Sequence, residues 1–166
     1  MPFTISEITY DDSPAILAVA AEFWGGPSIV AHGKLFQIEH LSGFKAVSSG
    51  QLSGFLQYEI QADACEILTL VSLDEGRGIG TALLSQVESF AKNKGLDLVH
   101  LVTTNDNLHA LGFYQRRGYH IAAVFPGQIE LSRQLKPAIP MIGENGIPIR
   151  DEIRLEKNLN TNKTVH

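Results

Sequence analysis

The pattern of hydrophobic and polar positions is clearest in the middle of the chain, where its period changes twice. An apolar run at residues 67–71 predicts a buried strand. Apolar residues then recur at helical spacing from Ile79 to Ala91, and Gly95 is expected to end that helix in the left-handed conformation. A second β-branched run at residues 98–104 predicts another buried strand, so the three elements form a βαβ unit.

The turn between the first strand and the helix is rich in glycine, at Gly76, Gly78 and Gly80. Backbone N–H groups at a helix N-terminus point outward and favour negative charge, and glycines leave them accessible, so this turn predicts a phosphate site. Two common phosphate loops are excluded by spacing. A Walker A loop needs a lysine, and none lies between Lys45 and Lys92; the G-x-G-x-x-G fingerprint lacks its third glycine.

The segment after the second strand carries the remaining chemistry. Asn107 is a plausible N-cap and Gly118 a plausible C-cap, so a helix is expected between them. Tyr114 follows Asn107 by about two helical turns, so both face the same side. The small Ala110 between them leaves room for a thin ligand. We expect Phe113 to pack in the core, and Tyr114 to serve the ligand.

These two segments resemble the two signatures of the GNAT acetyltransferase family. The turn at residues 75–80 fits Gln/Arg-x-x-Gly-x-Gly/Ala, except that Glu75 replaces the first Gln or Arg. Residues 107–119 fit Asn-x-x-Ala-x-x-Phe-Tyr-x-x-x-Gly-Phe/Tyr at every defined position. A carboxylate beside a pyrophosphate is electrostatically unfavourable, so either Glu75 turns away or Arg77 offsets its charge.

The resemblance implies the acyl-CoA N-acyltransferase fold. This is an α+β fold of three layers, with a mixed, mostly antiparallel central sheet of about six to seven strands and helices on both faces. The sheet is splayed between its fourth and fifth strands. The cosubstrate is acetyl-CoA, no metal takes part, and Tyr114 is the general acid. The implied cofactor-binding residues are Leu70, Val71, Ser72, Arg77, Gly78, Ile79, Gly80, Thr81 and Asn107.

The first part of the chain gives weaker patterns. Residues 3–10 alternate moderately, as in an edge strand, and Asp12 before a Ser-Pro pair predicts a helix N-cap. Further strands are expected at residues 43–48, 51–60 and 119–124. In the family, the first helices and their connecting loop border the acceptor site. Trp24 and residues 28–32 are therefore candidates for its wall, the alternative being a core anchor at Trp24 and a surface position for His32.

The end of the chain departs from the simplest family pattern. A helix is expected within residues 126–135, a loop at 138–148, and a final edge strand at 149–159, where apolar and charged residues alternate. This ending resembles that of a bacterial subgroup with a longer segment before the last strand. We expect residues 1–159 to form one domain and residues 160–166 a polar tail.

Composition and charge narrow the class of protein. The chain has 166 residues, of which 44% are hydrophobic and 19% charged, as in an ordinary globular domain. A net charge of −5 argues against nucleic acid and membrane partners. Cys65, the single cysteine, cannot form an internal disulfide and reads as a buried apolar residue, not a nucleophile. The six histidines show no metal-ligand spacing, and no signal or membrane-length segment is present, so a cytoplasmic location is expected.

The resemblance implies direct transfer of the acetyl group from acetyl-CoA to a primary amine of a small-molecule or peptide acceptor. The acceptor must attack as the free amine, and the residues that could take its proton are Glu66, His100, Asp106 and His32, none with a motif behind it. One alternative, prompted by Glu75, is a non-catalytic acyl-CoA-binding or sensor module. Another is a nucleotide-binding or nucleotide-hydrolysing domain. Family members are often dimers, so a homodimer is among the expected partners.

Overall fold

The computed structural model describes residues 2–160, so positions 161–166 of the expected tail lie outside the described residues. The chain has the predicted fold class: a mixed α/β fold with four α-helices and seven mostly antiparallel strands in its main sheet within residues 2–160. It divides into two compact units, which are described separately. Of the described residues, unit 1 holds 2–19, 39–99 and 158–160, and unit 2 holds 20–38 and 100–157.

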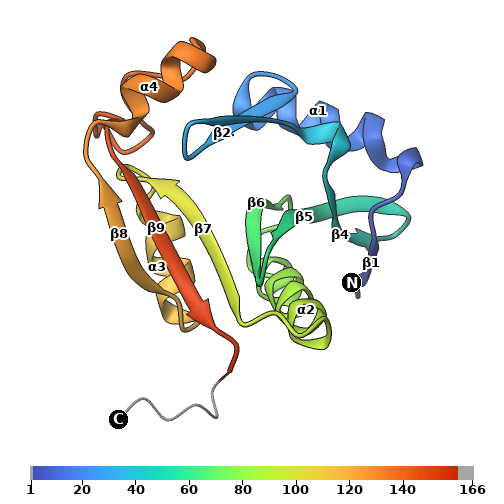
Figure 1. Ribbon diagram of the computed structural model, residues 1–166. Coiled ribbons are helices and arrows are strands. Elements are labelled where there is room, and N and C mark those ends of the chain that lie inside the picture. Colours follow the sequence, from blue (N-terminus) through green and yellow to red (C-terminus); the bar gives the residue numbers. More distant parts are fainter. Residues whose placement is uncertain (1, 161–166) are drawn as a thin grey trace. The chain divides into compact units, whose positions relative to one another are not determined.

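Unit 1 is an antiparallel sheet covered by one long helix. Its strands are β1 (Thr4–Glu7), β4 (Ser42–Ser48), β5 (Gln51–Gln61) and β6 (Ala64–Ser72), which pair in that order (Figure 1). Two short 3-10 helices also occur: η1 (Tyr10–Asp12) follows β1, and η2 (Ile38–His40) precedes β4. The helix α2 (Ile79–Asn93) packs against β4, β5 and β6. These elements confirm the strands and the helix that the sequence predicts here.

The helix α2 is held to the sheet by the stripe that its sequence period predicts. Its buried residues are Ile79, Leu83, Leu84, Val87 and Ala91. They meet the face of the sheet that carries Leu56, which has no exposed surface, and its strand partner Phe44, whose ring centroid lies 5.5 Å from that of Phe90 in α2. Burying a side chain of this size contributes about 1.5–3 kcal/mol each, so this contact supplies much of the unit's stability. Gly95 follows α2 with φ of 77°, which confirms the predicted left-handed end.

The predicted cap at Asp12 has a different role from the one expected. The helix α1 (Ser13–Trp24) begins directly after η1. The Asp12 carboxylate accepts the backbone N–H of Thr9 at 2.7 Å, which closes a capping box around η1. It also accepts the Lys45 ammonium at 2.7 Å, so its oxygens stabilise the turn and β4. The predicted helix start is confirmed, since α1 begins at Ser13, and the Asp12 carboxylate serves the 3-10 turn before it.

Unit 2 begins within α1 and contains most of the C-terminal elements. A hairpin of β2 (Ser28–Ala31) and β3 (Lys34–Gln37) follows α1. The other elements are β7 (Leu98–Thr104, from His100 onward), α3 (Leu108–Arg116), β8 (His120–Phe125), α4 (Gln128–Leu135) and β9 (Glu152–Asn158). The strands lie in the order β7-β9-β8, and α4 packs against the β2–β3 hairpin (Figure 1).

The final strand is not at an edge of the sheet, which corrects the prediction. β9 lies between β7 and β8, and β8 is the edge strand (Figure 1). Alternating charges suggested a solvent-exposed strand, but the structure buries Glu152 to 3% exposure and pairs Arg154 with Glu156 at 2.9 Å. The strand therefore carries a buried carboxylate and an ion pair within the unit, and the sequence pattern alone does not distinguish this from an exposed edge.

The hairpin β2–β3 was not predicted. His32 and Gly33 connect its strands with φ of 41° and 78°. Positive φ at both central residues is the feature of a type I′ turn, which suits the twist of a two-stranded hairpin. The sequence signal for this hairpin was therefore the His32-Gly33 pair between two short runs that contain apolar residues.

Among residues 2–160, no helix has the length and hydropathy needed to cross a membrane.

Candidate active site

The glycine turn of unit 1 leaves the N-terminus of α2 open. Gly78 is the N-cap residue with φ of 77°, and within the described residues no side chain caps this end of the helix. Gly76 has φ of 78°, and a Cβ added at either glycine would meet nothing within 4 Å. The turn therefore has open space beside Gly76 and Gly78, and its backbone is one that only glycine adopts without strain. This is the geometry that an anion needs at a helix N-terminus.

The turn is held against β5 by a close contact at Gly54 that sequence reasoning missed. Ile79 is 1% exposed, and its Cγ2 lies 2.8 Å from where a Cβ on Gly54 would stand. The same Cβ would lie 2.5 Å from the carbonyl oxygen of Val71. Gly54 in β5 thus lets β6 and the start of α2 approach closely. A lone glycine inside a predicted strand was the available signal for such a close approach.

Arg77 and Glu75 adopt different environments. The Arg77 guanidinium donates to the Asp74 carboxylate at 2.6 Å and to the Ser48 hydroxyl at 3.3 Å. Its Nη2 is buried and has no hydrogen-bond partner among the described residues. Glu75 is exposed. Arg77 is therefore paired with Asp74, and its Nη2 atom is shielded from solvent.

The other predicted residues of unit 1 lie on both sides of the turn. Leu70, Val71 and Ser72 end β6 and pair with β5 at Leu56, Phe55 and Gly54. Thr81 is exposed in the first turn of α2. The structure thus brings the strand end, the turn and the helix start of unit 1 into one contiguous segment. Asn107 and Tyr114 belong to unit 2 and are described there.

The helix α3 forms between the predicted caps. The Asn107 side-chain oxygen accepts the backbone N–H of Ala110 at 3.1 Å, so Asn107 is the N-cap. At the other end, Gly118 has φ of 91° and its N–H donates to the Gln115 carbonyl at 3.2 Å. The cap uses one lone pair of the Asn107 oxygen, and its amide N–H₂ group has two hydrogens that could contact a ligand.

Tyr114 and Phe113 exchange the environments that the sequence suggested. Tyr114 is 6% exposed and packs edge-to-face on Tyr119, with ring centroids 5.4 Å apart. Phe113 is half-buried, and the Arg117 guanidinium lies over its ring, with Cζ 3.7 Å from the ring centroid. The prediction that Phe113 is the core residue of this pair was therefore wrong, since Tyr114 is more buried than Phe113. Burial raises the pKa of the Tyr114 hydroxyl, so this group stays protonated at neutral pH.

The residues that could accept a proton are held in different ways. Burial lowers the pKa of His100 to about 4, with a smaller effect of Arg154, so this imidazole is neutral at pH 7 but a weak base. Asp106 accepts the Thr104 hydroxyl at 2.5 Å and borders the loop at Gly143. These contacts make Asp106 a structural residue of the loop. Glu66 is buried on β6 in unit 1.

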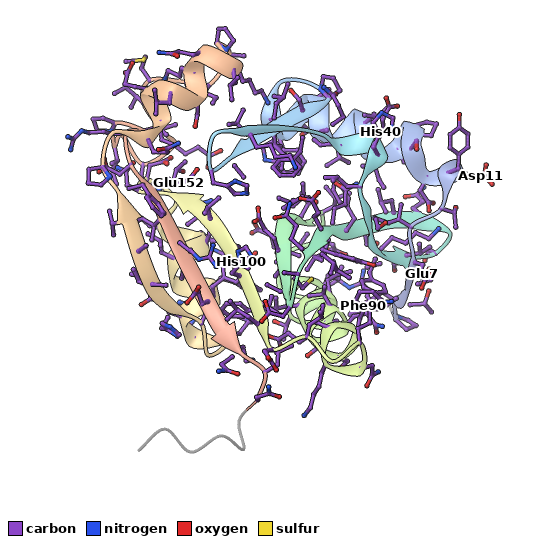
Figure 2. The ribbon with its side chains drawn as sticks, viewed as in Figure 1. Glu7, Asp11, His40, Phe90, His100 and Glu152 are labelled. Atoms are coloured by element: carbon purple, nitrogen blue, oxygen red, sulfur yellow. The ribbon has the colours of Figure 1, made fainter. Side chains whose placement is uncertain are left out.

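His32 connects the hairpin to β9. Its backbone N–H donates to the Glu152 carboxylate at 3.2 Å, and Figure 2 shows Glu152 at the start of β9 and His100 near the start of β7. Nearby, the Lys136 ammonium donates to the backbone carbonyls of Trp24 at 2.6 Å and Ser28 at 2.5 Å. Lys136 and Glu152, which both follow β8 in the chain, therefore bind the two ends of the predicted acceptor wall. Sequence reasoning missed Lys136 and Glu152, because their partners lie more than a hundred positions away.

Cys65 takes no part in this arrangement. It has no exposed surface, and burial raises the pKa of its thiol to about 12. Because the thiolate is the nucleophilic form, a thiol in this environment is unreactive at neutral pH. This agrees with its interpretation as an apolar residue.

Comparison with known proteins identifies the family. The sequence profile described as "Acetyltransferase (GNAT) family" matches residues 22–119, which include both the glycine turn and α3. The uncharacterized protein YdhI of Bacillus subtilis (strain 168) is 49% identical over 138 residues, which cover 82% of this chain and 86% of that protein.

Solved structures share the fold. An IAA acetyltransferase from Bacillus cereus ATCC 14579 matches with a TM-score of 0.70 at 23% identity, over 95% of this chain and 99% of that one. An acetyltransferase from Bacillus subtilis in complex with CoA matches with a TM-score of 0.65 at 22% identity, over 94% and 97%. The profile covers the two segments whose geometry is described above, and the chain therefore belongs to the GNAT acetyltransferase family.

Proposed function

We propose that this chain transfers the acetyl group of acetyl-CoA directly to a primary amine, with Tyr114 as the general acid. The observation that carries the proposal is the geometry of α3, where Tyr114 is a buried tyrosine about two helical turns after the N-cap residue Asn107 and keeps its proton at neutral pH. A general acid must hold its proton until the leaving group needs it. Tyr114 lies on the helix that Asn107 caps, as the second family signature requires.

The proposed cosubstrate site follows the open turn of unit 1. Backbone N–H groups of residues 78–81 would hold the pyrophosphate of acetyl-CoA, and the Arg77 guanidinium would add positive charge beside the turn. The ends of β6 at residues 70–72 and the amide of Asn107 would contact the pantetheine arm. Support comes from the related Bacillus subtilis acetyltransferase, which is described in complex with CoA. No metal is part of this proposal.

The reaction needs no covalent enzyme intermediate. The amine nitrogen attacks the thioester carbonyl carbon, a C–N bond forms and the C–S bond breaks. Tyr114 gives its proton to the departing thiolate, and the proton lost by the amine restores the tyrosine, so the products are an amide and CoA. The buried thiol of Cys65 has no step in this sequence.

The acceptor would be a small-molecule or peptide amine bound in the cytoplasm. The proposed wall of its site is the Trp24–His32 region, fixed in unit 2 by Lys136 and Glu152. Two backbone carbonyls bound by one ammonium restrict this region strongly, since hydrogen bonds to charged groups contribute about 1.5–3 kcal/mol. Selectivity among amines would then depend on a preorganised wall.

The experiment is an amine panel assayed by CoA release, followed by Tyr114→Phe on the best acceptor. The variant should lower kcat while acetyl-CoA affinity changes less than about twofold, because the ring and its packing remain. Tyr119→Phe is the matched control, since Tyr119 is a buried tyrosine that packs on Tyr114. Equal rates for wild type and Tyr114→Phe would remove Tyr114 from the mechanism.

A second candidate is a non-catalytic acyl-CoA sensor. It is favoured by one observation, that Asp74 neutralises Arg77 while Glu75 stays exposed beside the turn. A sensor would bind acetyl-CoA and release no CoA with any amine in the panel. The same assay therefore separates the two functions.

A further inference from the structure

An open cavity of about 450 Å³ lies at the C-terminal end of α2, within unit 1. Small-molecule sites have volumes of roughly 300–1,000 Å³, so its size suits a small ligand. Phe90 on α2 and His40 before β4, both labelled in Figure 2, line it from different elements. We call it the α2-end cavity, and its lining includes His40, Ser42, Tyr58, Ile60, Phe90 and Lys94.

Aromatic rings form one wall of the α2-end cavity. The ring centroids of Tyr58 and Phe90 are 5.0 Å apart, and the buried Phe44 lies 5.8 Å from Tyr58 and 5.5 Å from Phe90. Because the rings pack on one another, the half-buried rings of Tyr58 and Phe90 form a preformed surface. Ile60 is 37% exposed and lies on the same face of β5 as Tyr58. This wall suits a flat apolar group of a ligand.

The charge that the lining offers to a ligand is positive. The Lys94 ammonium lies 5.1 Å from the Phe90 ring centroid, and Lys94 forms no ion pair within residues 2–160. Glu59 also borders the cavity, but its carboxylate accepts the Gln61 side-chain amide at 3.3 Å. Since side chains alternate along a strand, Glu59 and Gln61 lie on the face of β5 opposite to Tyr58. An anionic group of a ligand would therefore meet Lys94.

The carbonyl groups at the end of α2 do not oppose an anion here. Carbonyl groups at a helix C-terminus repel negative charge when they are left without partners. In this helix the carbonyls of residues 90–92 accept the N–H groups of residues 94–96. The Lys94 ammonium is therefore the main charge at this end of the cavity.

Two hydroxyl groups add neutral donors to the same side. Burial raises the pKa of Tyr58, with smaller effects of Cys65 and Glu7, so its hydroxyl keeps its proton at neutral pH and can donate. Ser42 is the strand partner of Tyr58, so its side chain lies on the same sheet face. Glu7 pairs with Phe44 on β1, outside the cavity lining.

The α2-end cavity is separate from the glycine turn. The 15 residues of α2 rise about 1.5 Å each, so the ends of the helix are about 22 Å apart. The turn at Gly78 is at one end, and Lys94 is at the other. A ligand in the cavity would therefore bind together with acetyl-CoA, whichever reaction the chain performs.

We infer that the α2-end cavity is a binding site for a small aromatic carboxylate, with the ring against Tyr58 and Phe90 and the carboxylate at Lys94. The ring meets the preformed aromatic wall, and the carboxylate meets the one class of charge that the lining presents. Such a ligand contacts α2 and the strands β4 and β5 at once, so its binding stabilises the folded chain.

The test is titration of the isotope-labelled full chain with phenylpropionate, followed by amide NMR spectra. Amides of residues 40–42, 58–60 and 90–94 should shift and saturate, with a Kd below roughly 1 mM. Phenylpropylamine keeps the ring and reverses the charge, and propionate keeps the charge without the ring. Each should bind at least about tenfold more weakly. Absence of saturable shifts at these residues, or equal binding of either control compound, would overturn the inference.

A pair of lysine variants tests the charge directly. Lys94→Gln should weaken phenylpropionate binding by at least about fivefold, because the carboxylate loses its cation. Lys92→Gln is the matched control, since Lys92 is an exposed lysine in the last turn of α2 outside the lining, and it should bind as wild type does. Wild-type affinity in Lys94→Gln would contradict the site.

Competition separates this site from that of the cosubstrate. Saturating acetyl-CoA should leave the Kd of phenylpropionate unchanged, because the two sites lie at opposite ends of α2. Displacement of phenylpropionate by acetyl-CoA would place the probe at the glycine turn and overturn the inference. A chain that binds phenylpropionate but not acetyl-CoA would retain this site and lose the proposed function.

Discussion

The backbone N–H of His32 donates to the buried carboxylate of Glu152, although the two residues lie 120 positions apart. This bond holds the turn of the β2–β3 hairpin against the start of β9. Together with the bonds from Lys136 to Trp24 and Ser28, it connects residues 20–38 of unit 2 to its C-terminal part, and it gives the first prediction.

Glu152→Ala should lower the free energy of unfolding by about 1–3 kcal/mol, because the N–H of His32 loses its acceptor. Glu152→Gln keeps an acceptor oxygen and should lose less. Urea unfolding followed by circular dichroism measures both. Glu130→Gln is the control, since its side chain is 71% exposed. A Glu152→Gln protein more stable than wild type would show that burial of the charge outweighs the hydrogen bond.

His100 should make the fold less stable in acid. Its folded pKa is about 4, below the ordinary value of 6.5, so between these values the unfolded chain binds a proton that the folded chain does not. The stability is fully present above pH 6.5 and falls as pH decreases toward 4. The experiment compares the urea unfolding midpoints of wild type and His100→Gln at two pH values. About pH 7.5 lies above the window between the two pKa values of His100, and about pH 4.5 lies inside it.

His100→Gln should lose less stability than wild type over that pH change. His40→Gln is the matched control, because the His40 side chain is 75% exposed. Parallel losses in wild type and His100→Gln would mean that His100 titrates alike in the folded and unfolded chains.

Gly78→Ala should weaken acetyl-CoA binding by more than its effect on stability. The positive φ of Gly78 costs an alanine about 1–2 kcal/mol, and its methyl group would stand where the pyrophosphate approaches. Gly50→Ala imposes the same strain at φ of 74° in the β4–β5 turn, away from the site. Calorimetric titration should show a loss of at least about tenfold for Gly78→Ala only. Equal affinities in the two variants would contradict a phosphate site at this turn.

Glu75→Gln should raise acetyl-CoA affinity about threefold at low salt, because a carboxylate several ångströms from a pyrophosphate repels it weakly in water. The gain should disappear at high ionic strength, where the interaction is screened. Glu39→Gln, at a side chain 48% exposed, controls for the change in net charge. An unchanged affinity would mean that Glu75 points away from the cosubstrate.

The local elements were predictable from the sequence, because their signals are local. The helix period from Ile79 to Ala91 and the caps at Asn107 and Gly118 depend on neighbours in the chain, and the structure confirms each. The position of β9 depends on which strand it joins. Its alternating charges fit an exposed edge equally well, so the sequence alone could not place it inside the sheet.

The candidate site was predictable where its residues form a contiguous motif. The turn around Gly78 and the helix with Tyr114 were found in this way. Lys136 and Glu152 were not, since each acts on a backbone group more than a hundred positions distant. The burial of Tyr114 was also missed, because an aromatic pair in a motif does not show which ring faces the interior.

The most direct measurement of the central claim is calorimetric titration of the full chain with acetyl-CoA, with ATP and NAD as competitors. The account predicts binding of acetyl-CoA with a Kd in the micromolar range, about −8 kcal/mol, and no heat from ATP or NAD. Absence of acetyl-CoA binding, or equal binding of ATP, would contradict the assignment of the glycine turn as an acetyl-CoA site.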